Sequence, residues 1–174
     1  MGGVVLVEDE TRVEFEAKEA RIWAAKGKYP KVEITQEKKA HCFYGFLDIL
    51  SGEHIVHDSE RMISKETVKA LDKIKAHYKK KIKDKKRILI IWDGAPWHRG
   101  EVKEYLKGKS WLELLYFPPY SSELNPEEQV WNQAKREITQ NHEEQDFDEL
   151  IYKFYRRIAG KRFSTKMCRN ILMF

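Results

Sequence analysis

The stretch Ile88-Leu89-Ile90-Ile91-Trp92-Asp93 is a run of five apolar residues that ends on an acidic one. A short run of this kind is typical of a strand buried on both faces of a sheet. A second run, Gly3-Val4-Val5-Leu6-Val7, leads in the same way to Asp9. These are the first and fourth strands in the expected order of elements, and in a mixed sheet covered by helices we expect them to be parallel neighbours. Asp9 and Asp93 would then lie together at the carboxyl ends of the strands, where α/β sheets place their ligand crevice.

Hydrophobic periodicity and turn residues predict the remaining elements and a mixed α/β sheet covered by helices. A helix is expected behind Ser64 as its cap, because apolar residues then recur every three or four positions up to Ile82. Asn125-Pro126 is a typical helix start, with the cap followed by proline at the first helical position. The other expected segments are extended stretches at Arg12–Phe15, Ala20–Ala24, Lys39–Ile49 and Glu53–His57, turns at Lys26–Pro30 and Ser51-Gly52, strands at Arg87–Trp92 and Leu112–Phe117, and helices at Arg99–Leu106 and Phe147–Ile158.

Composition indicates one globular domain over residues 1–174. Hydrophobic residues make up 41% and charged residues 35%, which is enough apolar material for a core. The two cysteines, Cys42 and Cys168, have no metal-ligand spacing and form no disulfide framework, which favours a reducing cytoplasm. No run is long enough to span a membrane and no signal peptide is recognised. Membrane proteins and secreted disulfide-rich proteins are therefore excluded as classes.

The net charge of +5 is unevenly distributed. Residues 64–87 carry eleven Lys or Arg against three acids, and residues 153–169 carry seven against none. Basic strips beside an acidic centre suit a metal enzyme that binds phosphates. The alternative is a pair of solvated helix faces.

A third carboxylate, Glu128, ends the segment that runs from Pro118 to Glu128, and 34 residues separate it from Asp93. Three acidic residues can hold a pair of hard cations, since Mg²⁺ takes few protein ligands and keeps its other positions for water and phosphate. Each residue also has a structural interpretation. Asp9 and Asp93 could be turn residues, and Glu128 could close a capping box on Asn125. The metal hypothesis depends on the three together.

The motifs around these carboxylates resemble the DDE transposases of the mariner-like superfamily and its bacterial and archaeal insertion-sequence relatives. The resemblance lies in Val7-Glu8-Asp9-Glu10-Thr11, Arg21–Gly27, Trp92-Asp93-Gly94-Ala95-Pro96-Trp97-His98, and the segment from Pro118 to Glu128 with Trp131 and Lys135 after it. It implies an RNase H-like fold with a five-stranded sheet. It also implies metal-dependent cleavage at transposon ends, followed by transfer of the 3′-hydroxyl into target DNA.

By this resemblance Asp9, Asp93 and Glu128 are the catalytic residues and the ligands of two Mg²⁺ or Mn²⁺ ions. Gly94 stands where the family usually has Asn, and Ser122-Glu123 where it usually has Pro-Asp. Glu127 replaces a usual apolar residue and so competes with Glu128 for the third position. Helical spacing puts Glu127 on the core-facing stripe and Glu128 at its edge. This alone does not decide between them, and the match to the family position favours Glu128, with Glu127 as the alternative. His98 is expected either to contact DNA or to be a hydrogen-bonded structural histidine.

Transposases of this kind normally carry helix-turn-helix modules before the catalytic domain, and none fits ahead of Asp9. We therefore expect an isolated catalytic domain that results from a truncated gene, a split reading frame or a shortened chain. Its expected partner is DNA, at transposon ends and target, with a homodimer, a separate DNA-binding subunit or a missing N-terminal domain left open. The expected location is the cytoplasm, at the nucleoid in a prokaryote. The alternatives are a stand-alone RNase H-like nuclease and an inactive, domesticated nucleic-acid-binding remnant.

Overall fold

The computed structural model describes residues 3–18, 21, 23–28, 31 and 37–168. Its centre is a five-stranded sheet in the order β3-β2-β1-β4-β5. The first three strands are β1 (Val4–Glu14), β2 (Ala40–Asp48) and β3 (His54–Ser59), and they pair antiparallel. β4 (Ile88–Trp92) and β5 (Leu112–Tyr116) add parallel pairs on the other side of β1. The predicted mixed α/β sheet is confirmed, as is the parallel pairing of the strands before Asp9 and Asp93.

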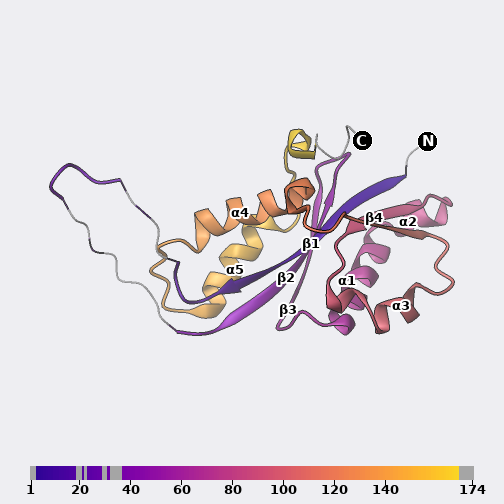
Figure 1. Ribbon diagram of the computed structural model, residues 1–174, viewed down its shortest axis with the longest axis horizontal. Helices are drawn as coiled ribbons and strands as arrows, with labels where there is room; N and C mark the ends of the chain where they lie inside the picture. Colours follow the sequence, from indigo (N-terminus) through magenta and orange to yellow (C-terminus); the bar gives the residue numbers. More distant parts are fainter. Residues whose placement is uncertain (1–2, 19–20, 22, 29–30, 32–36, 169–174) are drawn as a thin grey trace.

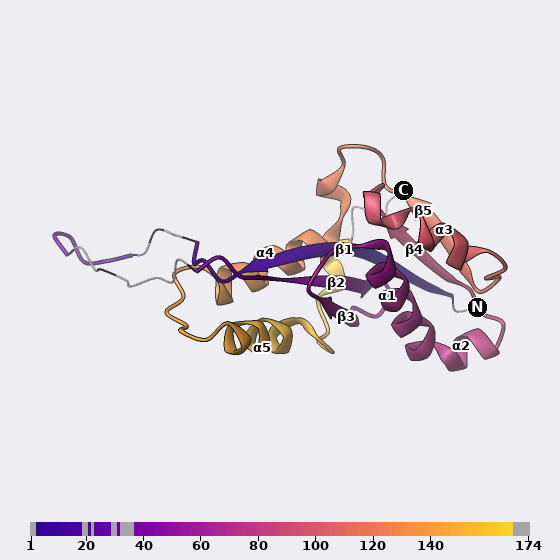
Figure 2. The ribbon, with the colours of Figure 1, turned by 90° about the horizontal axis from the view of Figure 1, so that it is seen from below.

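Helices cover both faces of the sheet (Figure 1). One layer holds α1 (Ser64–His77), α2 (Lys79–Lys83) and α3 (Glu101–Leu106). In the chain, α1 and α2 come before β4 and α3 comes after it. The other holds α4 (Pro126–Ile138) and α5 (Phe147–Ile158), which pack on each other and on β1 and β2. Figure 2 shows β1, β2 and β3 side by side with α5 next to them. Short 3₁₀ turns lie at Pro96–His98, Ser122–Leu124 and Thr165–Cys168.

Alternation along β1 divides the core into two clusters. Val4 and Leu6 face α1 and α3, whereas Val7, Val13 and Phe15 face α4 and α5. Because neighbouring side chains of a strand point to opposite faces, Asp9 lies on the face of α4 and α5. Glu8 and Glu10 lie on the opposite face.

The expectation that the first strand ends near Asp9 was wrong. β1 continues to Glu14 and pairs with β2 along its whole second half, with Asp9 opposite Gly45. What ends is the pairing with β4, whose last partners are Val7 and Ile91. β1 and β4 therefore separate just before their aspartates, and this opens space beside Asp9.

The first long helix also differs from the prediction. It begins at Ser64 itself, Ile63 occupies the cap position without a side-chain hydrogen bond, and the helix breaks at Tyr78 before α2. The other expected helices and strands are present to within two residues at each end. The two cysteines are free and buried. The expected strand Ala20–Ala24 and the end of the turn at Lys26–Pro30 include residues outside the described ranges. Among the described residues, none of the helices combines the length and apolar character needed to cross a bilayer.

Candidate active site

Asp93 directly follows β4 and keeps 58% of its side chain exposed. Its Oδ1 accepts a hydrogen bond of 2.8 Å from the amide of Ala95, which forms the local turn expected of an Asp-Gly pair. His98 Nδ1 lies 3.3 Å from the same oxygen and 3.0 Å from the Asp93 carbonyl. The hydrogen bond from His98 holds the pKa of Asp93 below its usual range. Asp93 is therefore fixed in place and ionised.

Glu128 lies in the first turn of α4 and is half-buried. Asn125 caps the helix by accepting from the amide of Glu127 at 3.0 Å. The backbone amide of Asn125 donates to Ser122, so the group that a capping-box glutamate would accept from is already used. Glu128 is therefore not needed as a cap.

Asp9, Asp93 and Glu128 line one cavity of about 590 Å³. The rest of its wall is formed by Gly94, Asn125 and the loop over residues 116–122. Three segments that are far apart in the sequence thus bring their carboxylates to the same opening. Glu127 does not line this cavity.

Asp9 lies near other acidic side chains, of which Glu128 lines the cavity and Glu10 and Glu127 do not. Burial, together with the charges of Glu10, Glu127 and Glu128, raises the pKa of Asp9 to about 8. Such a carboxyl keeps its proton near neutral pH unless a cation lies beside it. Oxygen donors that repel one another in this way are a suitable ligand set for hard divalent cations.

Glu127 points into the core, where its side chain is fully buried. Its Oε1 accepts from Nε2 of His54, which is also fully buried, and Nδ1 of His54 donates to the Ile158 carbonyl at 2.8 Å. Gly45 provides the space, because a Cβ there would lie 1.9 Å from Glu127 Oε1. Glu127 thus has a buried hydrogen-bond partner, and Gly45 leaves room for its side chain. This favours Glu128 as the residue available to a ligand.

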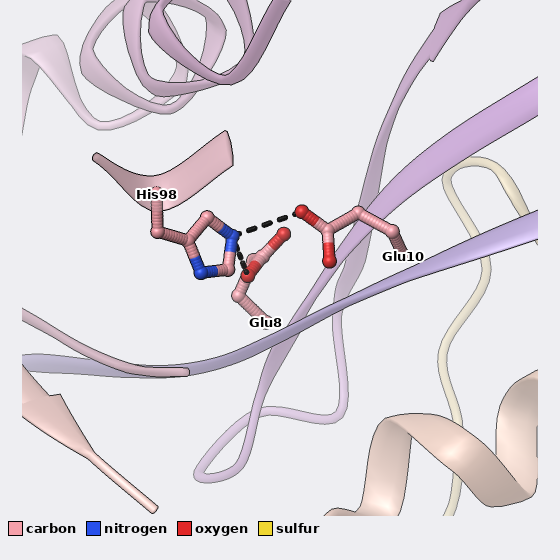
Figure 3. Close-up of side chains that lie close together, drawn as sticks. All are labelled: Glu8, Glu10 and His98. Carbon is pink, nitrogen blue, oxygen red and sulfur yellow. Dashed lines mark hydrogen bonds and ion pairs between the residues drawn. The ribbon is translucent and has the colours of Figure 1, made fainter. Parts of the chain in front are cut away.

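His98 lies on the other face of β1 between two more acidic residues (Figure 3). Its Nε2 is 2.9 Å from Glu10 Oε1 and 3.4 Å from Glu8 Oε2, and its ring stacks on Trp92 at a centroid distance of 4.2 Å. Burial lowers the pKa of His98, but the bonds to Asp93 and Glu10 outweigh it and raise the pKa to about 11. The ring is therefore a charged donor on both nitrogens.

These contacts leave His98 only 5% exposed. Of the two roles that the sequence left open, the geometry supports the hydrogen-bonded one, in which His98 holds Asp93. Glu8 and Glu10 were not expected in the site. The signal that could have found them is alternation, because both flank Asp9 and share one face of the strand.

The chain matches the model of a known protein family. The match is to the DDE superfamily endonucleases and covers residues 4–151. The chain belongs to this family. The motifs that carry the resemblance therefore predicted the family correctly.

Two curated relatives were found. An uncharacterized 39 kDa protein of insertion element IS630 from Shigella sonnei is 25% identical over 150 residues, which is 86% of this chain and 43% of that protein. The uncharacterized protein y4pE/y4sA of Sinorhizobium fredii is 33% identical over 70 residues, which is 40% of this chain and 50% of that protein. In both matches the aligned part amounts to about half of the relative or less.

Solved structures confirm the RNase H-like fold. The Mos1 transposase paired-end complex with the left transposon end has a TM-score of 0.68 at 15% identity, covering 97% of this chain and 51% of that one. The catalytic domain of Mos1 mariner transposase has a TM-score of 0.65 at 16% identity, covering 97% and 75%. The sheet and helices of this chain therefore share the fold of a transposase catalytic domain.

Proposed function

We propose that this chain is the catalytic domain of a transposase, a single unit over residues 1–174 that cuts DNA at transposon ends and joins the freed 3′-hydroxyl to target DNA. The observation that carries the proposal is the convergence of Asp9, Asp93 and Glu128 on one cavity. Membership of the endonuclease family and the transposase fold support it. Structures of Mos1 complexes with Mn and with Mg support the choice of Mg²⁺ or Mn²⁺.

Asp9, Asp93 and Glu128 would hold two divalent ions, which activate water or a 3′-hydroxyl and stabilise the leaving oxygen of the phosphodiester. The protein's own residues place these ligands. His98 holds Asp93, the Asn125 cap fixes the first turn of α4, and the Glu127–His54 pair anchors that turn to the core. DNA is the proposed partner, with the basic residues of 64–87 as sequence-independent phosphate contacts.

The test is Asp93→Asn, because the amide oxygen can still accept from Ala95 while the charge is lost. We expect Mg²⁺-dependent nicking and strand transfer to fall to background, and the circular dichroism spectrum and unfolding midpoint to stay near those of the unchanged protein. Asp148→Asn is the matched control, since Asp148 lies in the first turn of α5 and outside the cavity.

The products distinguish the rival functions. A transposase joins the 3′ end to a second DNA, whereas a stand-alone nuclease only hydrolyses. An inactive remnant would neither cut DNA nor bind Mn²⁺ in a calorimetric titration. Nicking retained in Asp93→Asn would refute the proposed site.

A further inference from the structure

The part of the cavity wall formed by residues 116–122 is uncharged and contains three aromatic residues. Residues 116–122 read Tyr-Phe-Pro-Pro-Tyr-Ser-Ser, without a single Lys, Arg, Asp or Glu. Tyr120 is fully exposed and Tyr116 is 54% exposed, and both line the cavity with Asp9, Asp93 and Glu128. A wall without cations is not built to bind the phosphates of DNA. The part of a nucleotide that it can bind is the base.

Tyr120 is held outward by an unusual backbone conformation. Its φ is +59°, in the left-handed region that bulky L-residues rarely adopt. Strained backbone of this kind is found mainly at functional sites. Among the described residues, no hydrogen bond or ring contact is formed with the Tyr120 side chain. The conformation therefore places a free aromatic ring in solvent without gaining a contact within the protein.

The loop that carries Tyr120 is attached at both ends to the elements that carry the carboxylates. At its start the Phe117 amide donates to the Trp92 carbonyl at 2.9 Å, and the Tyr116 ring contacts the Trp92 ring at 6.3 Å. At its end the Asn125 amide donates to Ser122 at 2.9 Å, directly before α4. The tyrosines are thus positioned relative to Asp93 and Glu128. Gly94 also lines the cavity, and no atom lies within 4 Å of the position that a Cβ would take there.

We propose that Tyr120, with Tyr116 beside it, is a stacking site for an unpaired nucleobase next to the phosphate that the three carboxylates receive. The assignment rests on the proposed function and adds a base subsite to it. Stacking suits this site because every base has an apolar face, so the contact tolerates any sequence. It also needs no positive charge beside carboxylates that must be free to hold cations.

The test measures binding of a fluorescent duplex with a single-stranded 3′ extension by anisotropy, with Ca²⁺ in place of Mg²⁺ to prevent cleavage. A matched set of DNAs carries one abasic site at successive positions. For the unchanged protein we expect one abasic position to weaken binding about 5- to 150-fold, the range of a single base–aromatic stack. Tyr120→Ala should bind intact DNA as weakly as the unchanged protein binds the DNA with that abasic site. The abasic site should then weaken binding of Tyr120→Ala no further. Tyr120→Phe should retain both the binding of intact DNA and the sensitivity at that position.

Tyr152→Ala is the control, because Tyr152 is another exposed tyrosine (55%), which lies on α5 and does not line the cavity. An abasic penalty that persists in Tyr120→Ala would overturn the proposal, as would a uniform loss of binding at all positions. A shift in oligomeric state on sedimentation with unchanged DNA binding would assign Tyr120 to a protein contact and overturn it too. Mg²⁺-dependent nicking by the same proteins separates the two proposals. If the unchanged protein nicks and binds intact and abasic DNA equally well, only the stacking site is refuted. If the unchanged protein neither binds nor nicks DNA, the proposed function is refuted as well.

Discussion

The buried pair of Glu127 and His54 allows a sharp test of why this chain has a glutamate in a usually apolar position. Both side chains are fully buried, so removing either leaves an uncompensated polar or charged group in the core. For Glu127→Leu we expect a loss of about 3–5 kcal/mol, the usual cost of breaking a buried pair. That is a large part of a typical stability of about 5–15 kcal/mol.

The double variant His54→Leu/Glu127→Leu should be much more stable than the single losses predict. Replacing both partners by apolar residues is often neutral or better. One cost remains here, because the Ile158 carbonyl loses the 2.8 Å bond from His54 Nδ1, and an unpaired buried group costs about 1–3 kcal/mol. We therefore expect the double variant to lie within about 1–3 kcal/mol of the unchanged protein, with a coupling energy of at least about 3 kcal/mol.

Urea unfolding followed by tryptophan fluorescence measures these differences. At a slope near 2 kcal/mol per molar, the Glu127→Leu loss would lower the midpoint by roughly 1.5–2.5 M. The exposed pair of Lys107 and Glu104 is the matched control, since both side chains are 67% exposed and should couple by less than about 1 kcal/mol. Additive losses at His54 and Glu127 would refute the reasoning. The double variant should also keep Mn²⁺ binding, because Glu128 remains. A loss of that binding would instead make Glu127 the third ligand.

Three further outcomes are expected. The folded protein keeps the Asp9 proton to about pH 8, whereas the unfolded chain releases it near 3.8. The metal-free protein should therefore lose stability as pH rises between these values, and Mn²⁺ affinity measured by calorimetry should rise until about pH 8, because the ion displaces that proton. A flat profile would contradict the raised pKa. His98→Ala should weaken Mn²⁺ binding about 10- to 100-fold by releasing Asp93, and His98→Asn should recover part of it, since its amide can replace Nδ1. Gly45→Ala should destabilise the fold by about 1–3 kcal/mol in thermal unfolding, because its Cβ would meet Glu127 Oε1 at 1.9 Å.

The sheet could be predicted because its signals are local. The apolar run Ile88–Trp92 is too continuous for a surface strand, and the change from period two to period three or four marks the start of α1. The helix start at Asn125-Pro126 was equally local, and the observed cap matches it. The break at Tyr78 could not be predicted, because apolar periodicity continues through it to Ile82.

The partners inside the site were less predictable, since they depend on contacts across the sequence. His98 and Glu10 are 88 residues apart, and Glu127 and His54 are 73 apart. Periodicity on α4 correctly placed Glu127 on the core-facing side, since Glu127 is buried and only Glu128 of the two lines the cavity. It could not show that a histidine and a glycine from two other strands make that burial tolerable.

The separation of β1 from β4 explains how one short segment can both hold a ligand and support another. Beyond Val7, β1 loses its parallel neighbour but keeps its pairing with β2, so it continues as a strand while space opens on one side. Alternation then directs Asp9 to the face of α4, where Glu128 lies, and Glu10 to the face of His98, which holds Asp93. Had the strand ended at Asp9, as the sequence suggested, Glu10 would have no fixed direction and His98 would lose the acceptor for its second nitrogen. The extension of β1 therefore positions both aspartates. It carries Asp9 itself, and through Glu10 it holds His98, which in turn holds Asp93.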